Sequence, residues 1–324
     1  MRYRLEIHTD ETARQERLEA DVREGLTAWQ KSLPPKYFYD RAGSLLFERI
    51  TELPEYYPTR TEAALLGEIV PGLIGEILPT DIVEIGAGSS EKTRWILNAA
   101  TAGGRTIRYV PLDVDRLTLE ATAARLTRDY PTLSVHAVVA DFERDLAHVP
   151  LPTGRRLALF LGSTIGNLDA PERRRLLAGL RTLLPGSDDR LLLGVDLVKD
   201  VKVLEAAYDD SAGVTRDFNR NILHVVNHAV DGDFAPEAFR HHAFYNEEAS
   251  RIEMHLVADS AQTVKLGRLG LTVRFQPGDD IWTENSYKFT REGVEAMLAG
   301  ASLDLVQWHV DPANYFALAL AAPR

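Results

Sequence analysis

Short apolar segments and longer amphipathic segments alternate along the middle of the chain from about residue 62. The short segments are rich in Val, Ile and Leu, and such alternation is typical of βαβ units that build a parallel sheet covered by helices. Asp169 and Glu172 have the spacing of a capping box, which predicts a helix start, and Pro185-Gly186 predicts its end. The predicted strands are 81–86, 106–113, 133–141, 155–162 and 190–197.

The segments on either side of this region have other patterns. The first sixty residues look helical with aromatic interruptions, and they contain no strand–turn–helix unit. After Asp200, a helical segment leads into a β-rich stretch from about 239 to 289. The chain then returns to a helix followed by two strands, 302–310 and 314–322, an antiparallel pair of the kind that closes an otherwise parallel sheet.

These patterns together predict an α/β fold with two domains. A doubly wound, Rossmann-like domain with a terminal antiparallel strand pair is expected from residues 61–199 and 287–324. The remainder, residues 1–60 and 200–286, is expected to form a smaller α+β domain on the substrate side. With 324 residues, 45% of them hydrophobic and 26% charged, the chain is long enough for a full core and has the composition of a folded protein.

Charge and cysteine content exclude several classes of protein and site. Asp and Glu outnumber Lys and Arg by 48 to 37, which gives a net charge of -11 without any basic run, so nucleic acid is not an expected partner. The absence of cysteine excludes disulfides, a thiolate nucleophile and cysteine metal ligands. The N-terminus has no signal-peptide pattern and the longest apolar runs are strand-sized, so we expect a cytoplasmic protein without a membrane span. No metal is expected, and a monomer is compatible with the sequence.

The first predicted strand runs through glycines into a helix, in the sequence VEIGAGSSEKTRWIL at 83–97. A dinucleotide fingerprint would have a third glycine where Glu91 stands. A phosphate loop would have a glycine directly before its lysine, and this chain has glutamate there too. The turn is therefore typical of nucleotide sites in general but matches neither phosphate-binding pattern.

The same turn is suited to an anionic group. Gly86 and Gly88 allow close approach of a ligand to the backbone, and Ser89 or Ser90 is expected to cap the following helix. The amides at a helix N-terminus favour an anion, and Lys92 adds a positive charge one turn along. A carboxylate would suit this arrangement as well as a phosphate.

Acidic residues also end the next two predicted strands, and ligands of open parallel sheets bind beyond such strand ends. Asp113 is placed to accept hydrogen bonds from ribose hydroxyls, while Asp141 could accept from an adenine amino group and Phe142 could lie on the base. Each residue alone is also compatible with a plain turn or cap. Together they favour an adenosine with an amino-acid tail, S-adenosylmethionine, over the nucleotide of an oxidoreductase.

Six segments in order along the chain carry a closer similarity: VEIGAGSSEKTRWIL, FLGSTIGNL, DLVKD, YDDSAGVTRDFNRNIL, RIEMHL and TENSYKF. They resemble the histidine N-alpha-methyltransferases of ergothioneine biosynthesis, and the resemblance covers nearly the whole chain. It implies the transfer of three methyl groups from S-adenosylmethionine to the α-amino group of free L-histidine, giving hercynine. The cofactor residues that it implies are Gly86, Lys92, Asp113, Asp141 and Phe142.

The resemblance also implies the substrate residues, which are Tyr56, Asn167, Tyr208, Met254, Glu284 and Ser286. Asn167 and Tyr208 would hold the carboxylate, and Tyr56 would lie by the reacting amine. Glu284 and Ser286 would receive the imidazole, with Met254 packed against it. Sequence spacing supports one part independently: residues two apart on a strand face the same way, and a carboxylate with a hydroxyl can serve both ring nitrogens.

Simpler interpretations exist for several of these residues. Met254 lies between Ile252 and Leu256 at period two and would otherwise be assigned to the core. Tyr56 could belong to a packed loop, Asn167 to a turn and Tyr208 to a solvated helix end. Trp282 departs from the pattern that we expect and could alter access to the ring end of the pocket.

The expected chemistry is an in-line displacement by a neutral amine, which needs alignment rather than a metal. Tyr56 could face the developing cation with an oxygen or a ring, and Tyr39 is a second candidate to relay the amine proton. The sequence shows no clear general base, so solvent could take the proton. The alternatives are a relative that methylates another amino acid such as tryptophan, which Glu284 disfavours, and a nicotinamide-dependent oxidoreductase, which Glu91 disfavours.

Overall fold

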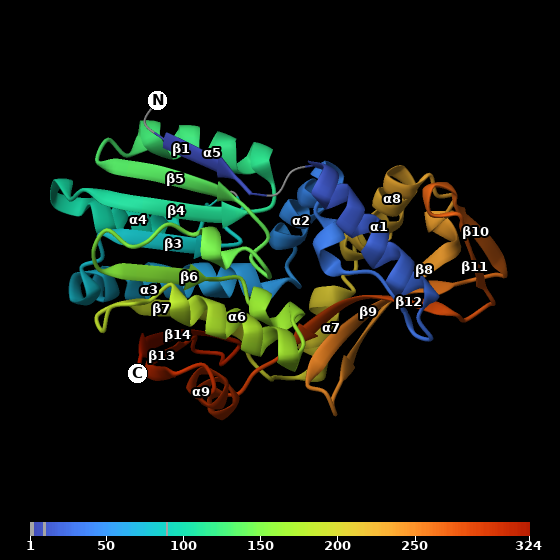
Figure 1. Ribbon diagram of the computed structural model, residues 1–324. Coiled ribbons are helices and arrows are strands. Elements are labelled where there is room, and N and C mark those ends of the chain that lie inside the picture. The colour runs from blue at the N-terminus through green and yellow to red at the C-terminus, as the bar shows by residue number, and fades with distance from the viewer. Residues whose placement is uncertain (1–2, 9–10, 89) are drawn as a thin grey trace. The chain divides into compact units, whose positions relative to one another are not determined.

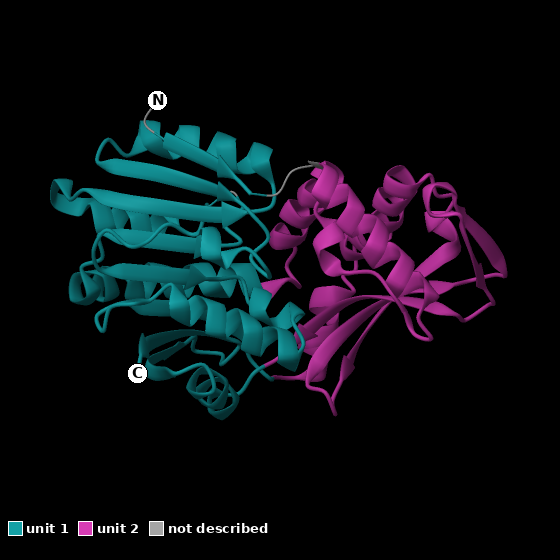
Figure 2. Cartoon of the chain, in the orientation of Figure 1, with its two compact units in different colours: residues 1–10, 58–198, 289–324 teal, residues 11–57, 199–288 magenta. Residues whose placement is uncertain are grey.

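The chain forms two compact units in the computed structural model, which describes residues 3–8, 11–88 and 90–324 (Figure 2). Unit 1 consists of residues 1–10, 58–198 and 289–324, and unit 2 consists of residues 11–57 and 199–288. Each unit is therefore assembled from segments that are far apart in the sequence.

Unit 1 is built on an eight-stranded mixed sheet with the strand order β1-β5-β4-β3-β6-β7-β14-β13 (Figure 1). Neighbouring strands from β1 to β7 pair in parallel, while β14 is antiparallel to both β7 and β13. The five strands predicted in the middle of the chain and the closing antiparallel pair are confirmed. The strands span Tyr3–Ile7 (β1), Asp81–Ile85 (β3), Ile107–Asp113 (β4), Leu133–Val139 (β5), Arg156–Phe160 (β6), Arg190–Asp196 (β7), Leu303–Val310 (β13) and Phe316–Pro323 (β14).

Strand β1 corrects the helical prediction for the start of the chain. It pairs in parallel with β5 at one edge of the sheet, and Tyr3 and Leu5 pack against the main core. The signal for a strand was present, because Tyr3, Leu5 and Ile7 alternate with the charged Arg4 and Glu6. That alternation covers only five residues and precedes a long helical pattern, so it was too short to predict a strand.

The helices of unit 1 bury apolar side chains against the sheet. One core cluster joins residues of α3, α4 and α5 to the central strands, including Leu66, Leu97 and Leu126. The predicted capping box is confirmed, since Asp169 Oδ1 accepts from the Glu172 amide at 2.8 Å and Glu172 Oε2 accepts from the Asp169 amide at 2.7 Å. The helices span Tyr57–Ile77 (α3), Arg94–Thr101 (α4), Arg116–Asp129 (α5), Ala170–Thr182 (α6) and Arg291–Ala299 (α9).

A buried ion-pair network lies at the amino-terminal ends of the central strands. Asp81 is fully buried and accepts from Arg156 Nε at 2.7 Å and from Arg108 Nε at 2.6 Å. Arg156 also donates to the carbonyls of Leu183 (3.1 Å) and Pro150 (2.6 Å). Burial lowers the pKa of the Arg156 guanidinium, and the Asp81 charge opposes that shift. The network satisfies a large cation in the core and fixes the end of the sheet opposite to the glycine turn.

Unit 2 contains a four-stranded sheet, β2-β12-β9-β8, and a separate pair, β10-β11. In the four-stranded sheet, β12 pairs antiparallel with β9 and β9 with β8, while β2 is parallel to β12. The β-rich stretch predicted from about residue 239 is confirmed. The strands span Lys31–Ser32 (β2), Phe239–Asn246 (β8), Arg251–Ala258 (β9), Gln262–Leu266 (β10), Leu271–Phe275 (β11) and Asp280–Tyr287 (β12), and the helices Glu11–Thr27 (α1), Arg41–Glu52 (α2), Val201–Tyr208 (α7) and Val214–Val230 (α8).

A bulge at Thr283 interrupts the pairing of β12 with β9. Trp282 is opposite His255 and Glu284 is opposite Met254, so Thr283 is an extra residue. Its buried hydroxyl donates toward Asn219 Oδ1 at 2.7 Å and the Met254 carbonyl at 3.0 Å. Because directly opposed residues share a face and neighbours on a strand do not, Trp282 and Glu284 lie on opposite faces of the sheet.

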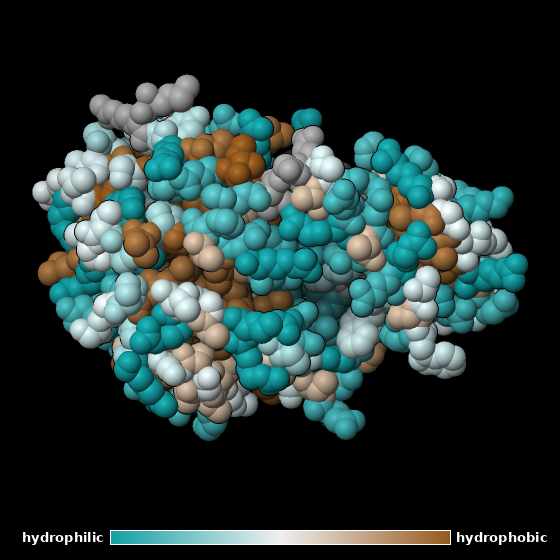
Figure 3. All heavy atoms as spheres, viewed as in Figure 1, coloured by the Kyte–Doolittle hydropathy of each residue, from teal (hydrophilic) through white to brown (hydrophobic). Residues whose placement is uncertain are grey.

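The surface mixes hydrophilic and hydrophobic residues, as the face in Figure 3 shows. The most exposed large apolar side chains, Trp29, Leu117 and Leu151, are scattered along the chain, which is ordinary for a folded protein. Within the described residues, no helix combines the length and the apolar character needed to cross a membrane.

Candidate functional site

The glycine turn of unit 1 leaves open space beside its backbone. Gly86 and Gly88 have φ of +69° and +49°, a conformation that side chains disfavour, and a Cβ added at either would meet no atom within 4 Å. The helix α4 begins later than expected, with Thr93 as its N-cap and no side-chain capping bond. Ser90 is therefore not the predicted cap, since its hydroxyl is buried 2.7 Å from that of Tyr109, and Ser89 lies outside the described residues.

Asp113, at the end of β4, is tied to this turn. Its Oδ2 accepts from the Gly88 amide at 2.9 Å and its Oδ1 accepts from the Asp115 amide at 3.0 Å. Burial raises the pKa of the Asp113 carboxyl, and these two backbone bonds oppose the shift. The carboxylate thus fixes the glycine turn against the neighbouring strand, and each oxygen retains a further lone pair for a ligand.

Asp141 and Phe142 follow β5 at the same end of the sheet. Asp141 is buried, and its Oδ1 accepts from the Glu143 amide at 3.0 Å. The Phe142 ring is partly buried and packs edge-on against Phe160 of β6 at 5.6 Å. The tips of β3, β4 and β5 therefore gather residues that the sequence predicted for a cofactor, because parallel strands end at a common edge.

Lys92 pairs with a residue that sequence reasoning missed. Its Nζ forms an ion pair with Glu62 of α3, which is fully buried. The other oxygen of Glu62 accepts from the Gly162 amide at 2.7 Å, directly after β6. A Cβ at Gly194 would lie 2.3 Å from Glu62 Oε1, so the glycine on β7 makes room for this carboxylate. Glu62 therefore fixes the position of the Lys92 ammonium.

A second buried acid, Glu84, lies next to the glycine turn. Glu84 of β3 accepts hydrogen bonds from Thr93 Oγ1 and from the Tyr109 hydroxyl. Burial raises the pKa of the Glu84 carboxyl to about 7, against these two bonds. Glu91, which stands where a dinucleotide site has its third glycine, pairs instead with Arg125 of α5.

In unit 2, three polar side chains meet in the protein interior. The Tyr208 hydroxyl, at the end of α7, lies 2.6 Å from Ser286 Oγ on β12. Lys288 is buried and donates to Ser286 Oγ at 2.7 Å and to the Tyr208 hydroxyl at 3.1 Å. The buried His241 donates from Nε2 to the Tyr208 carbonyl at 2.8 Å, because its Nδ1 accepts from Asn219 at 2.9 Å. The Tyr208 position is thus fixed from both the side chain and the backbone.

Glu284 lies on the same strand and face as Ser286. It is opposite the buried Met254 of β9, and its side chain remains partly exposed to solvent. Among the residues that the structure describes, no donor bonds its carboxylate. Burial raises the pKa of Glu284 to about 7, and the charge of Lys288 opposes this shift. A desolvated carboxylate without a hydrogen-bond donor is unfavourable in free energy. A ligand that brings an N–H group would supply the missing donor.

Tyr56, which the sequence predicted to lie by the reacting amine, belongs to a cluster of aromatic rings in unit 2. Tyr56 packs edge-on against Tyr208 at 6.3 Å and against Phe47 at 6.1 Å. Tyr39 packs against Phe47 and Phe218, each at 5.6 Å. The structure therefore brings Tyr39 and Tyr56 onto one aromatic cluster, with Phe47 between them. Asn167 belongs to unit 1, where it ends the short 3-10 helix Thr164–Asn167 after β6.

Comparison with known proteins identifies the family. Residues 18–323 match the sequence model of a family described as histidine-specific, S-adenosylmethionine-dependent methyltransferases. The chain belongs to this methyltransferase family. A histidine N-alpha-methyltransferase from Mycobacterium tuberculosis (strain CDC 1551 / Oshkosh) is 47% identical over 99% of this chain and 100% of its own.

Two further relatives of this methyltransferase come from a bacterium and a fungus. A histidine N-alpha-methyltransferase from Mycolicibacterium smegmatis is 50% identical over 94% of this chain and 95% of its own. The ergothioneine biosynthesis protein 1 of Neurospora crassa is 30% identical over 86% of this chain, which corresponds to 32% of its own length.

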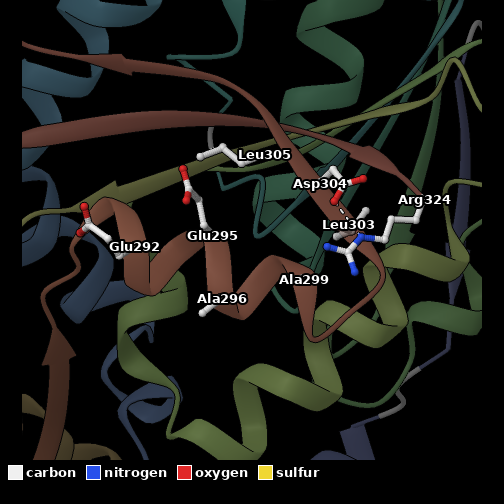
Figure 4. Close-up of a pocket in the computed structure, with 8 residues that line it drawn as sticks. All are labelled: Glu292, Glu295, Ala296, Ala299, Leu303, Asp304, Leu305 and Arg324. Carbon is white, nitrogen blue, oxygen red and sulfur yellow. Dashed lines mark hydrogen bonds and ion pairs between the residues drawn. The ribbon is translucent and has the colours of Figure 1, made fainter.

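A surface depression of the methyltransferase lies away from the candidate site residues. It is an open depression of about 650 Å³ in unit 1, and none of the predicted site residues lines it (Figure 4). Glu292 and Glu295 of α9 and Asp304 of β13 give it an acidic character, but Asp304 already pairs with Arg324 at 2.7 Å. Nothing in its lining suggests chemistry.

Trp282 lies on the other face of β12 from Glu284 and Ser286. Its ring stacks on His255 at 5.6 Å on the opposite face of the sheet, and the Arg251 guanidinium lies 4.5 Å from its centroid. Its Nε1 donates to the Glu284 carbonyl at 3.0 Å, so it touches the site only through the backbone. The bulge at Thr283 therefore places the Trp282 side chain on the other face of the sheet from Glu284, and its effect on access to the ring end stays a prediction.

Proposed function

We propose that this methyltransferase transfers three methyl groups from S-adenosylmethionine to the α-amino group of free L-histidine, giving hercynine, as the first step of ergothioneine biosynthesis. The arrangement of Glu284 and Ser286 carries the proposal. A neutral imidazole offers one N–H donor and one nitrogen acceptor, and these two side chains offer a carboxylate acceptor and a hydroxyl on one face of β12. The names of the two mycobacterial relatives support the same substrate.

The residues of unit 1 fit the methyl donor. The open space beside the glycine turn and the acid at the tip of β4 suit an adenosine carrying an amino-acid tail. Gly86, Lys92, Asp113, Asp141 and Phe142 would hold it. When bound, the donor supplies an electrophilic methyl group on a sulfonium centre.

Unit 2 is proposed to be the substrate domain. Tyr208 would bind the histidine carboxylate, Tyr56 would lie by the amine, and Met254 would pack against the imidazole. The carboxylate role of Asn167, a residue of unit 1, stays a prediction. The hydrogen bonds that hold the Tyr208 hydroxyl and carbonyl support this role, because a binding group is more selective when its position is fixed.

The reacting amine must be neutral and aligned with the methyl group, and it ends as a quaternary ammonium. That product has no N–H to donate in a hydrogen bond, and a nearby fixed cation would repel it. The rings of Tyr39, Tyr56 and Phe47 offer π faces, which attract such cations. Tyr56, with Tyr39 as a second candidate, would relay the amine proton toward solvent.

Methylation of another amino acid, such as tryptophan, is the alternative. An indole has one N–H and no ring acceptor, so Ser286 would lose its partner in the pocket. The family match removes the oxidoreductase alternative.

Mass spectrometry of free histidine and tryptophan, each incubated with the protein and S-adenosylmethionine, tests the proposal. Trimethylated histidine is the expected product. Methylation of tryptophan alone, or no transfer to histidine, would overturn it.

A further inference from the structure

Asn219 of α8 is a fully buried polar residue to which the proposed function assigns no role. Helix α8 packs against β8 and β9, and the Asn219 amide contacts three strands of the four-stranded sheet. Its Nδ2 donates to the His255 carbonyl on β9 at 3.1 Å and lies 2.9 Å from His241 Nδ1 on β8. Its Oδ1 accepts from the Thr283 hydroxyl on β12 at 2.7 Å. One amide therefore joins β8, β9 and β12.

The protonation of His241 follows from neighbours whose roles are fixed. The His255 carbonyl can only accept, so the nitrogen of the Asn219 amide faces it and donates. Because this nitrogen has no acceptor capacity, His241 Nδ1 accepts from it and the ring proton is on Nε2. The Tyr208 carbonyl, 2.8 Å from Nε2, accepts that proton. His241 is thus held as one neutral tautomer, and burial lowers the pKa of its ring in agreement with this.

The two ends of the Asn219 amide lead to the two ends of the proposed substrate pocket. Its oxygen holds Thr283, which is the extra residue of β12 and directly precedes Glu284. Its nitrogen holds His241, whose Nε2 donates to the Tyr208 carbonyl at the C-terminal end of α7. Carbonyls in that last turn have no partner within their helix, so a side-chain donor there fixes the helix end. The network therefore links the strand that carries Glu284 to the backbone of Tyr208.

We propose that Asn219 and His241 are positioning residues that fix Tyr208 relative to Glu284, so that unit 2 accepts an amino acid of the length of histidine. This inference rests on the proposed function, because it takes Tyr208 as the carboxylate end and Glu284 as the imidazole end. The two residues act through Thr283 and the Tyr208 backbone, not by touching the ligand. A binding group that is already in place loses less freedom when the ligand arrives, which strengthens binding.

Two neutral substitutions at His241 separate its two ring nitrogens. The amide of His241→Gln reaches the position of Nε2 and can still donate to the Tyr208 carbonyl, whereas that of His241→Asn reaches only the position of Nδ1. Calorimetry with S-adenosylhomocysteine present should show the dissociation constant for histidine raised at least about fivefold in His241→Asn. In His241→Gln it should return to within about threefold of the unmodified protein.

The other end of the network is tested with Thr283→Val, which keeps the shape of the side chain and removes its hydroxyl. We expect histidine affinity to fall at least about threefold. Asn219→Ala removes both arms, so its loss should be about the product of the losses in Thr283→Val and His241→Asn. Asn227→Ala is the matched control on α8, because the Asn227 amide bonds the Phe234 backbone at 2.8 and 2.9 Å. It should leave histidine affinity within about twofold even where it lowers stability.

Equal histidine affinities of His241→Gln and His241→Asn would overturn the inference, as would an Asn219→Ala affinity within about twofold of the unmodified protein. Urea unfolding of each variant checks that it is folded. If Asn219→Ala does not fold, the pair at His241 and Thr283→Val still decide the outcome. Absence of histidine binding by the unmodified protein would instead refute the proposed function, so the two failures are distinguishable.

Discussion

Each unit contains an acid whose burial destabilises its charged form. Glu284 and Glu84 are acids whose pKa is raised to about 7 by burial, yet they differ in partners. Glu84 has two hydroxyl donors in its own unit, so it is a structural group beneath the glycine turn. Glu284 has no donor among the described residues, which is typical of a group whose partner is a ligand.

Glu284→Gln should stabilise the free protein at pH 8 and weaken histidine binding. The folded-state pKa of about 7 exceeds the ordinary 4.5, so the folded protein loses stability as pH rises from about 4.5 through 7. The shift corresponds to about 3 kcal/mol at most, and partial exposure of the side chain reduces it. Urea unfolding should show the variant more stable at pH 8 and nearly equal at pH 4.5, with histidine affinity down at least about tenfold.

Glu253→Gln is the matched control on the neighbouring strand. Burial raises the pKa of Glu253, but hydrogen bonds, first among them that from Arg251, outweigh burial and lower it. Its charge therefore stabilises the folded protein above the ordinary pKa, and its removal should destabilise at pH 8. If both variants changed the stability at pH 8 in the same direction, the assignment of Glu284 as a desolvated acid without a donor among the described residues would be contradicted.

Gly194→Ala should weaken binding of the methyl donor through Glu62. The added Cβ would lie 2.3 Å from Glu62 Oε1, so the carboxylate must move and its ion pair with Lys92 is disturbed. Calorimetry should show S-adenosylhomocysteine affinity reduced at least about fivefold. Gly67→Ala, on α3 of the same unit, would place its Cβ 3.8 Å from the Trp95 ring, an ordinary contact, and should leave that affinity within about twofold. Equal effects of both changes would exclude this role of Glu62.

At the scale of elements, the sequence predicts strands most directly where every residue of the strand is buried. The strands β3 and β6 are buried at every position, and such runs of Val, Ile and Leu are readable without any partner. The bulge at Thr283 was not readable, because nothing in the letters TENS shows that β9 supplies one residue fewer. Sequence spacing therefore gave Glu284 and Ser286 correctly as neighbours on one face, but left Trp282 unassigned.

The ion-pair network at the amino ends of the strands should be worth more than any surface pair. Asp81→Asn removes the ion-pair partner of the buried Arg156 guanidinium, so we expect a loss of about 3 to 5 kcal/mol in the free energy of unfolding. Asp304→Asn, which breaks the exposed pair with Arg324, should cost at most about 1 kcal/mol. Denaturant unfolding of both variants measures the difference, and similar losses would mean that Arg156 finds other partners.

For the whole molecule, the sequence predicted the chemistry of the site better than its supporting contacts. Strand ends and short motifs identify Asp113 or Glu284, because those residues lie in recognisable local patterns. Glu62 and Lys288 have no such pattern, and their contacts in the site include Gly162, which lies 100 residues from Glu62, and Tyr208, which lies 80 residues from Lys288. Long-range packing supplies these partners, and a single sequence carries no local trace of it.

A chain that ends at residue 288 should fail to fold, although it keeps all of unit 2. It would lack β14, which covers the edge of the buried β7 in unit 1. An exposed apolar strand edge promotes aggregation. Size-exclusion chromatography should therefore show aggregates. Deletion of residues 1–8, which removes the edge strand β1, should instead leave a folded but less stable protein that elutes like the full-length chain. A monodisperse truncated chain with the circular dichroism of the full protein would contradict this.

Because β12 has an extra residue, the side chains on its two faces are under separate evolutionary constraints. Trp282 on one face is constrained by stacking, and Glu284 and Ser286 on the other are constrained by ligand recognition. In a regular strand these three positions would share a face, and a change in the stacked ring would alter the ligand wall. With the faces separated, substitutions in the stack can accumulate while the ligand wall stays constant. Relatives could thus diverge on the outside of this sheet without changing what they methylate.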